Sequence, residues 1–122
     1  MASPYPFLDD EHFELLLANG KLARAFQARD ALFDPLPVVK LFTPDAGATW
    51  LLTEIDPESP SIAFGLCDLG LGFPELGCVS LDELASVRGM LRLPIERDIG
   101  FKATQPLSVY ATAARSAGRI QA

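Results

Sequence analysis

The sequence predicts a single α+β domain of 122 residues, in which helices pack against one antiparallel meander sheet of four to five strands. Hydrophobic residues make up 49% of the chain and charged residues 21%, proportions typical of a globular domain with one core. Three strand-like runs are joined by short reversals, and helical patterns lie before and after them. We expect an N-terminal helical segment (1–36), a sheet with an inserted middle helix (37–103) and a C-terminal helix (104–122).

The N-terminal segment predicts two amphipathic helices. In the first, Phe13, Leu16 and Leu17 share one helical face behind acidic N-cap candidates, and Gly20 is expected to end the helix. A second apolar stripe runs over residues 22–33, and the prolines that follow are expected to end this second helix.

Three strands are expected at residues 38–43, 49–56 and 61–68. Segments rich in proline, serine, aspartate or glycine separate them, as in tight reversals of the chain. Consecutive strands should therefore pair in antiparallel fashion, and no parallel crossover is needed.

A glycine-rich loop follows at residues 70–77. It lacks the lysine and the serine or threonine of a phosphate-binding loop, and it does not lead directly from a strand into a long helix. Its glycines are therefore expected to permit tight turns, while Phe73 and Leu76 pin the loop to the core. A short fourth strand is expected at residues 78–79.

Residues 80–83, with the sequence Ser-Leu-Asp-Glu, form a capping box that predicts the start of the middle helix. Arginine and glycine at 88–89 suit the end of that helix. Another strand is expected over residues 95–102. Pro106 suits the start of a C-terminal helix, and Gly118 is expected to follow its end.

The formal net charge is −6, from 16 acidic and 10 basic side chains, which argues against direct binding to nucleic acid or to anionic lipid. No apolar run reaches the roughly 18 residues that a membrane helix needs, so no membrane partner is expected. The N-terminus lacks the basic start and the apolar stretch of a signal peptide, which predicts a cytoplasmic location.

Neither a metal nor a cofactor is predicted. Cys67 and Cys78 lack the Cys-x-x-Cys spacing that favours zinc, and in a reducing cytosol they are expected to be two half-buried thiols. His12 is the only histidine and lies among acidic residues, which argues against a serine-histidine-aspartate site.

Several short motifs occur in a specific order over nearly the whole chain beyond Pro37. These motifs are Leu41-Phe42-Thr43-Pro44-Asp45, Thr49-Trp50-Leu51-Leu52-Thr53-Glu54, Pro74-Glu75-Leu76-Gly77, Ser80-Leu81-Asp82-Glu83-Leu84, Arg88-Gly89 and Leu93-Pro94-Ile95-Glu96-Arg97-Asp98. By these motifs the chain resembles the domain of unknown function 2958 family. The resemblance implies a bacterial protein, often from a plasmid or an integrated mobile element, and it implies no accepted activity. At Cys78 the chain departs from the family, where relatives commonly carry an aromatic residue.

Trp50 and Glu54 are expected on one face of the second predicted strand, because side chains at alternate positions share a face. A carboxylate on an apolar face needs a partner, and Lys40, Arg88 or Arg97 could supply it. Such an ion pair with Glu54 would have a purely structural role. The functional alternative is a polar spot beside an aromatic wall in a ligand groove.

Glu96, Arg97 and Asp98 place three consecutive charges in a predicted strand, so at least one of its faces should meet solvent or a site. Together with Glu54 and Glu75, these carboxylates could hold magnesium or manganese in a hydrolase. No spacing in the sequence requires such a site.

We therefore favour a non-enzymatic protein-binding or accessory module over two alternatives, a carboxylate-dependent hydrolase and an acidic antirestriction protein that mimics DNA. The expected partner is another protein, and a homodimer through an exposed edge strand stays open. The candidate surface is formed by Trp50, Glu54, Phe73, Glu75, Arg88, Glu96 and Arg97.

Overall fold

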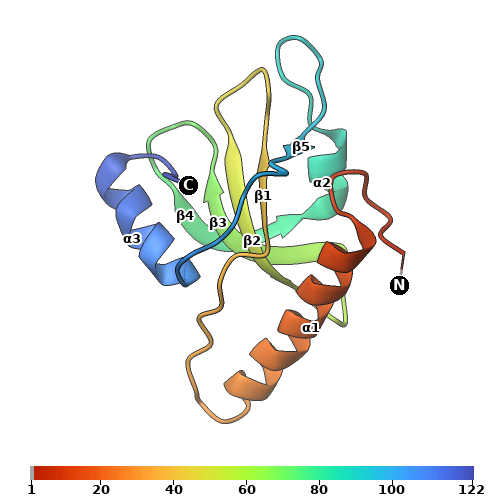
Figure 1. Ribbon diagram of the computed structural model, residues 1–122, viewed down its shortest axis with the longest axis vertical. Helices are drawn as coiled ribbons and strands as arrows, with labels where there is room; N and C mark the ends of the chain where they lie inside the picture. The colour runs from red at the N-terminus through yellow and green to blue at the C-terminus, as the bar shows by residue number, and fades with distance from the viewer. Residues whose placement is uncertain (1) are drawn as a thin grey trace.

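A computed structural model describes residues 2–122 and contains one open, five-stranded antiparallel sheet with helices on both faces (Figure 1). The strand order is β4-β3-β2-β1-β5, so β4 and β5 are the edges. The elements are α1 (Asp10–Gln27), β1 (Val39–Phe42), β2 (Thr49–Ile55), β3 (Ile62–Asp68), β4 (Glu75–Ser80), α2 (Leu81–Ser86), β5 (Glu96–Arg97) and α3 (Leu107–Ala117). The predicted α+β fold with an antiparallel meander is confirmed.

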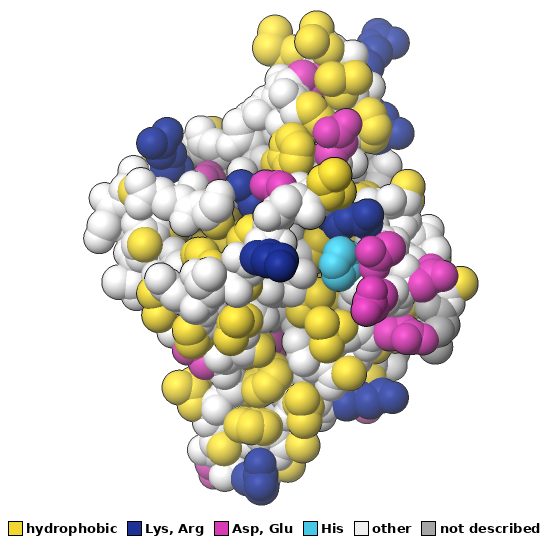
Figure 2. All heavy atoms as spheres, in the orientation of Figure 1, with side chains coloured by type: hydrophobic (Ala, Val, Ile, Leu, Met, Phe, Trp, Pro, Cys, Tyr) yellow, Lys and Arg dark blue, Asp and Glu magenta, His cyan; other side chains and the backbone are white. Residues whose placement is uncertain are grey.

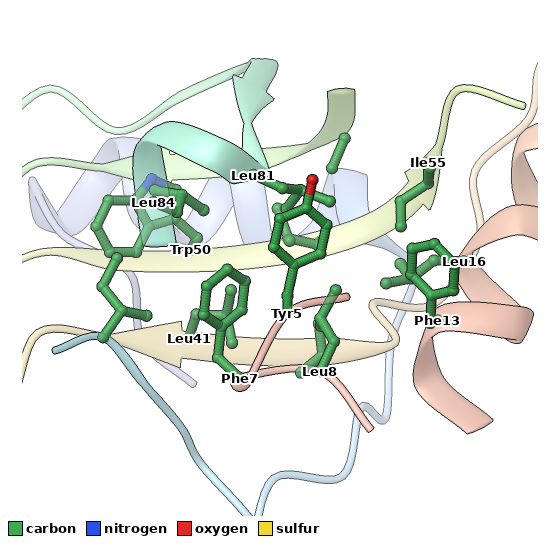
Figure 3. Packing of buried hydrophobic residues seen from close by; sticks show 14 residues of the cluster. Tyr5, Phe7, Leu8, Phe13, Leu16, Leu41, Trp50, Ile55, Leu81 and Leu84 are labelled. Carbon is green, nitrogen blue, oxygen red and sulfur yellow. The ribbon is translucent and has the colours of Figure 1, made fainter. Parts of the chain in front are cut away.

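The larger core lies on the face of the sheet that α1, α2 and the N-terminal segment cover (Figure 3). Its sheet side chains come from alternate strand positions, as the two-residue period of a strand requires. Tyr5 and Phe7 stack with ring centroids 5.6 Å apart, and the Tyr5 hydroxyl donates to Asp82 Oδ1 at 2.9 Å. Burial first, then the Asp82 hydrogen bond, raises the pKa of Tyr5 to about 12. The N-terminal segment is thereby tied to α2.

A smaller core lies on the opposite face, where α3 packs against β2 and β3. Leu51 and Leu66 meet Leu107 across this interface. The start of α3 receives its cap from a distant segment, because Asp34 Oδ1 accepts the Ser108 amide at 3.0 Å. Its far end is held by buried Asp68, whose Oδ2 accepts the Ile120 amide at 2.9 Å.

Gly20 lies inside α1, so the predicted pair of N-terminal helices is wrong. The helix continues to Gln27, and the chain then turns through Asp30, which has a φ of 50°. Gly20 is buried, and a Cβ there would lie 1.8 Å from the carbonyl oxygen of Ile55. Glycine is needed at this position because the helix backbone lies directly against β2.

A bulge in β2 changes which side chains share a face. Leu52 pairs with Gly65 and Glu54 with Phe64, so Thr53 is the extra residue on β2. Beyond the bulge the alternation reverses, and Ile55 joins the larger core.

Three other boundaries differ from the prediction. The Ser80 hydroxyl caps α2 as expected, accepting the Glu83 amide at 3.1 Å, but α2 ends at Ser86 because the next residue is extended. The strand β4 is longer than predicted, and β5 is shorter. The chain turns away from β1 after Asp98, whose Oδ1 accepts the Gly100 amide at 3.0 Å.

The edge strand β4 pairs with β3 on one side only. Leu81 N donates to Ser61 O at 2.7 Å, which makes these two residues a hydrogen-bonded pair. Hydrogen-bonded and non-hydrogen-bonded pairs alternate along an antiparallel ladder, so the main-chain amide and carbonyl groups of Leu76 and Cys78 point away from β3. A homodimer through this edge stays a prediction. Among residues 2–122, no helix is long and apolar enough to cross a membrane.

Candidate functional site

Three of the residues singled out in the sequence, Arg88, Glu96 and Arg97, line one groove of about 680 Å³. The groove lies between the N-terminal segment, the end of α2 and the segment that contains β5. Its apolar side chains include Phe7, Leu84, Ile95 and Ile99 among others. The structure therefore brings together one part of the predicted candidate surface.

The two arginines of the groove are held by main-chain carbonyl groups. Arg88 Nη1 donates to Ala85 O at 3.1 Å and to Val87 O at 2.8 Å, while Arg97 Nη1 donates to Phe7 O at 3.3 Å. These bonds orient both guanidinium groups without neutralising their charge.

A loop of residues 88–94 projects at one end of the sheet (Figure 1), and its first and last residues, Arg88 and Pro94, line the groove. Its side chains are strongly exposed: Met90 by 93%, Leu91 by 75% and Leu93 by 41%. The loop is held at its base by Asp45, whose Oδ2 accepts the amides of Leu91 at 2.6 Å and Leu93 at 3.3 Å. This anchor keeps the apolar side chains in solvent.

The loop between β3 and β4 lies at the same end of the sheet and is also apolar (Figure 1). Leu69 is 61% exposed, Leu71 is 74% exposed and Phe73 is 80% exposed. The prediction that Phe73 and Leu76 pin this loop to the core is therefore wrong. The loop contacts the β1–β2 turn instead, where a Cβ on Gly70 would lie 3.0 Å from Gly47 O.

Trp50 does not belong to the candidate surface. It is only 3% exposed and packs in the larger core, close to Leu84 and Phe7 (Figure 3). The expectation of an exposed tryptophan that contacts a partner is wrong, because the face of β2 that carries Trp50 is covered by helices.

Glu54 lies on the opposite face of the sheet from Trp50, because the bulge at Thr53 reverses the alternation. It lines a second pocket of about 310 Å³ that also contains Cys78 and Arg24. Its carboxylate accepts the Thr53 hydroxyl at 2.7 Å and forms no ion pair with any cation of residues 2–122. Lys40, its predicted partner, pairs with Asp98 at 3.4 Å.

Burial raises the pKa of Glu54, while the Thr53 hydrogen bond opposes the shift. The folded state therefore holds the proton more tightly than the unfolded state, so stability falls as the pH rises through the ordinary pKa of a glutamate and then the folded pKa. We expect Glu54→Gln to raise the free energy of unfolding more at pH 7 than at pH 4. Urea unfolding at both pH values measures this, with exposed Glu96→Gln as the control. An equal effect of Glu54→Gln at both pH values would contradict the expectation.

Glu54, Glu75 and Glu96 do not converge, so the predicted carboxylate site does not form. Glu75 lies on β4 and Glu96 on β5, the two outer strands of the sheet. Four strand spacings of about 4.8 Å separate these strands by roughly 19 Å, far beyond a shared metal with ligand distances of about 2.0–2.6 Å. No group of three or more potential metal-ligating side chains occurs within residues 2–122.

The two cysteines are free and face opposite sides of the sheet. Cys67 packs against the larger core, whereas Cys78 is exposed and lies across from Phe64 on the other face. Burial, with a smaller effect of Cys78, raises the pKa of the Cys67 thiol to about 11. The expectation of two half-buried thiols holds for Cys67 and is wrong for Cys78.

Sequence reasoning named Phe73 for the candidate surface but missed the other exposed apolar residues of the two loops. The signal was present in the glycine-rich loop, where Leu71 and Phe73 alternate with glycine and have no adjacent helix or strand pattern to bury them. Met90 and Leu91 were overlooked because a short apolar run near a proline looks the same whether the core or solvent receives it. Only tertiary contacts distinguish the two cases.

A family model described as "Protein of unknown function (DUF2958)" matches residues 7–121. No curated protein and no solved structure matches the chain.

Proposed function

Since the chain belongs to the DUF2958 family, whose description assigns no activity, we propose from its surface that it is a non-enzymatic protein-binding or accessory module. A role in a bacterial mobile element is part of this proposal and rests on the family resemblance alone, while the proposed cytoplasmic location rests on the N-terminal sequence. The partner is a protein that covers the apolar end of the sheet.

One observation carries the proposal: two separate loops expose large apolar side chains at the same end of the sheet. Leu69, Leu71 and Phe73 belong to one loop, and Met90 and Leu91 belong to the other. Figure 2 shows hydrophobic side chains gathered at the end where the 88–94 loop projects. Large apolar patches of this kind mark interaction sites on soluble proteins more often than they mark monomer surfaces.

The loops are also held in place before any partner binds. Asp45 fixes the 88–94 loop through two main-chain amides, and Gly47 and Gly70 place the turn and the neighbouring loop in contact. A surface that is ordered beforehand loses less conformational entropy on association. This favours a docking surface over a segment that folds only on binding.

The alternative of a DNA mimic requires an extended acidic stripe. The face in Figure 2 mixes acidic and basic side chains, and the acidic ones gather mainly beside His12. Arg24 pairs with Asp56 at 2.6 Å and with Glu58 at 3.0 Å, which offsets acidic charge elsewhere. A mixed surface supports the protein-binding proposal over mimicry.

The test compares partner capture by three double variants in a lysate of the native host. Leu71→Ser/Phe73→Ser and Met90→Ser/Leu91→Ser are expected to reduce capture at least tenfold, because each removes apolar area from the contact. Leu32 is 86% exposed and Leu36 is 49% exposed, both away from the two loops, so Leu32→Ser/Leu36→Ser is the matched control. Thermal melts verify folding. Equal capture by all three variants and the wild type would refute the proposal.

A further inference from the structure

Arg88 and Arg97 place two positive charges in the groove of an acidic protein. Neither arginine forms an ion pair within the described part of the chain. The basic side chains that lie beside carboxylates there are His12, Arg24 and Lys40. Asp98 also lines the groove, but it is paired with Lys40 at 3.4 Å. The charges of the two arginines are therefore available to a ligand.

Glu96 also lines the groove but forms no ion pair with either arginine. Glu96 and Arg97 are adjacent in β5, so their side chains leave the strand on opposite faces. Arg97 pairs with Leu41, a member of the larger core, and thus lies on the face that carries Leu84 and Arg88. The positive side of the groove is the side formed by α2 and the N-terminal segment.

The inner surface of the groove is apolar and firmly held. Phe7, Leu84 and Ile95 line it and belong to the larger core, each less than a tenth exposed. Two hydrogen bonds fix the N-terminal wall, from Tyr5 to Asp82 and from Arg97 to the Phe7 carbonyl. The groove thus combines apolar contact area with two oriented cations.

The main chain at the edge of the groove is available for pairing. Asp98 N donates to Lys40 O at 2.9 Å, so the neighbouring pair of Leu41 and Arg97 is a non-hydrogen-bonded pair. The amide and carbonyl groups of Arg97 consequently point away from β1. No main-chain hydrogen bond of Arg97 outside the sheet occurs among residues 2–122.

We propose that this groove binds an extended, acidic and apolar segment of the partner protein, with Arg88 and Arg97 contacting its carboxylates. The proposal deepens the protein-binding function and rests on it. Apolar side chains of the segment lie over Phe7, Leu84 and Ile95, and its main chain pairs with that of Arg97. Arginine presents several donors in a planar fork, which suits carboxylate recognition.

The test selects binders from a phage-displayed library of random dodecapeptides, with the whole protein as bait. The selected peptides are then synthesised, and their Kd is measured by fluorescence anisotropy. The selected sequences are expected to combine acidic and apolar residues. Arg88→Glu should weaken their binding at least tenfold, as should Arg88→Gln, which keeps hydrogen-bond donors but removes the charge. Arg115→Glu makes the same charge change on the exposed surface of α3 and should leave the Kd unaltered. Raising the NaCl concentration should weaken binding further.

Other outcomes overturn the proposal in distinguishable ways. Selection of apolar peptides without acidic residues, or binding that is insensitive to Arg88→Gln, removes the charge recognition but leaves the protein-binding function standing if the loop variants still lose their partner. Failure to select any peptide removes the groove as the site. Competition by a single-stranded DNA oligonucleotide in place of acidic peptides would assign the arginines to phosphate. If the loop variants also capture the partner normally, the proposed function falls as well.

Discussion

Gly20→Ala is expected to lower the free energy of unfolding by about 3 kcal/mol or more, although alanine is the better helix former by about 1 kcal/mol. The reason is contact between backbones: the new Cβ would lie 1.8 Å from Ile55 O and 3.0 Å from the Ile55 carbonyl carbon. These atoms belong to a central strand and cannot rotate away as a flexible side chain would. Relief of the clash requires α1 to move off β2, which opens the larger core around Leu16.

Urea unfolding followed by circular dichroism measures the loss, and a fall in melting temperature of roughly 10 °C should accompany it. Lys21→Ala is the matched control, because Lys21 is the next residue of α1 and is exposed. This control is expected to change stability by no more than about 0.5 kcal/mol. A Gly20→Ala protein as stable as the wild type would show that α1 and β2 are not in the close contact described here.

Gly65→Ala is expected to have a similarly large effect, at the β2 bulge. A Cβ on Gly65 would lie 2.0 Å from Leu51 O and 2.9 Å from Leu52 Cα. Leu51 belongs to the smaller core and Leu52 to the larger one, so a displacement of β2 at this point disturbs the packing on both faces. We expect a loss of about 3 kcal/mol or more.

Gly77→Ala is the matched control for Gly65→Ala, because Gly77 is the direct cross-strand partner of Gly65 on β4. A Cβ there has no heavy atom within 4 Å. Alanine at Gly77 should leave stability unchanged or raise it by up to about 1 kcal/mol, since it restricts the unfolded chain. Equal urea midpoints for the two variants would contradict the close approach at the bulge.

The bulge also explains why sequence reasoning placed Glu54 incorrectly. A regular strand puts Trp50, Leu52 and Glu54 on one face, and a bulge leaves no distinct mark in the residue pattern. The extra residue, Thr53, is fully buried and polar; its hydroxyl bonds to the Glu54 carboxylate, and its carbonyl accepts the Asn19 amide at 2.9 Å. These contacts come from neighbours in space as well as in sequence.

The candidate site divides in the same way. Arg88, Glu96 and Arg97 were recognisable because charged residues near a predicted strand face solvent or a site, and the structure places all three in one groove. Trp50 was misplaced because an aromatic residue on a strand gives no sign of whether a helix covers it. Met90 and Leu91 were missed because their exposure depends on Asp45, an anchor far away in the sequence.

By itself, the sequence determined the elements that depend on neighbouring residues: the three meander strands, the Ser80 cap of α2, and the start and end of α3 at Pro106 and Gly118. Local steric preferences and short-range hydrogen bonds decide these features, and both are legible in a few consecutive residues. Only the tertiary structure decided whether Gly20 ends a helix, which face carries Glu54, and which apolar loops stay in solvent. Those outcomes depend on the distance between backbones and on which surfaces cover one another, and segments far apart in the chain establish both.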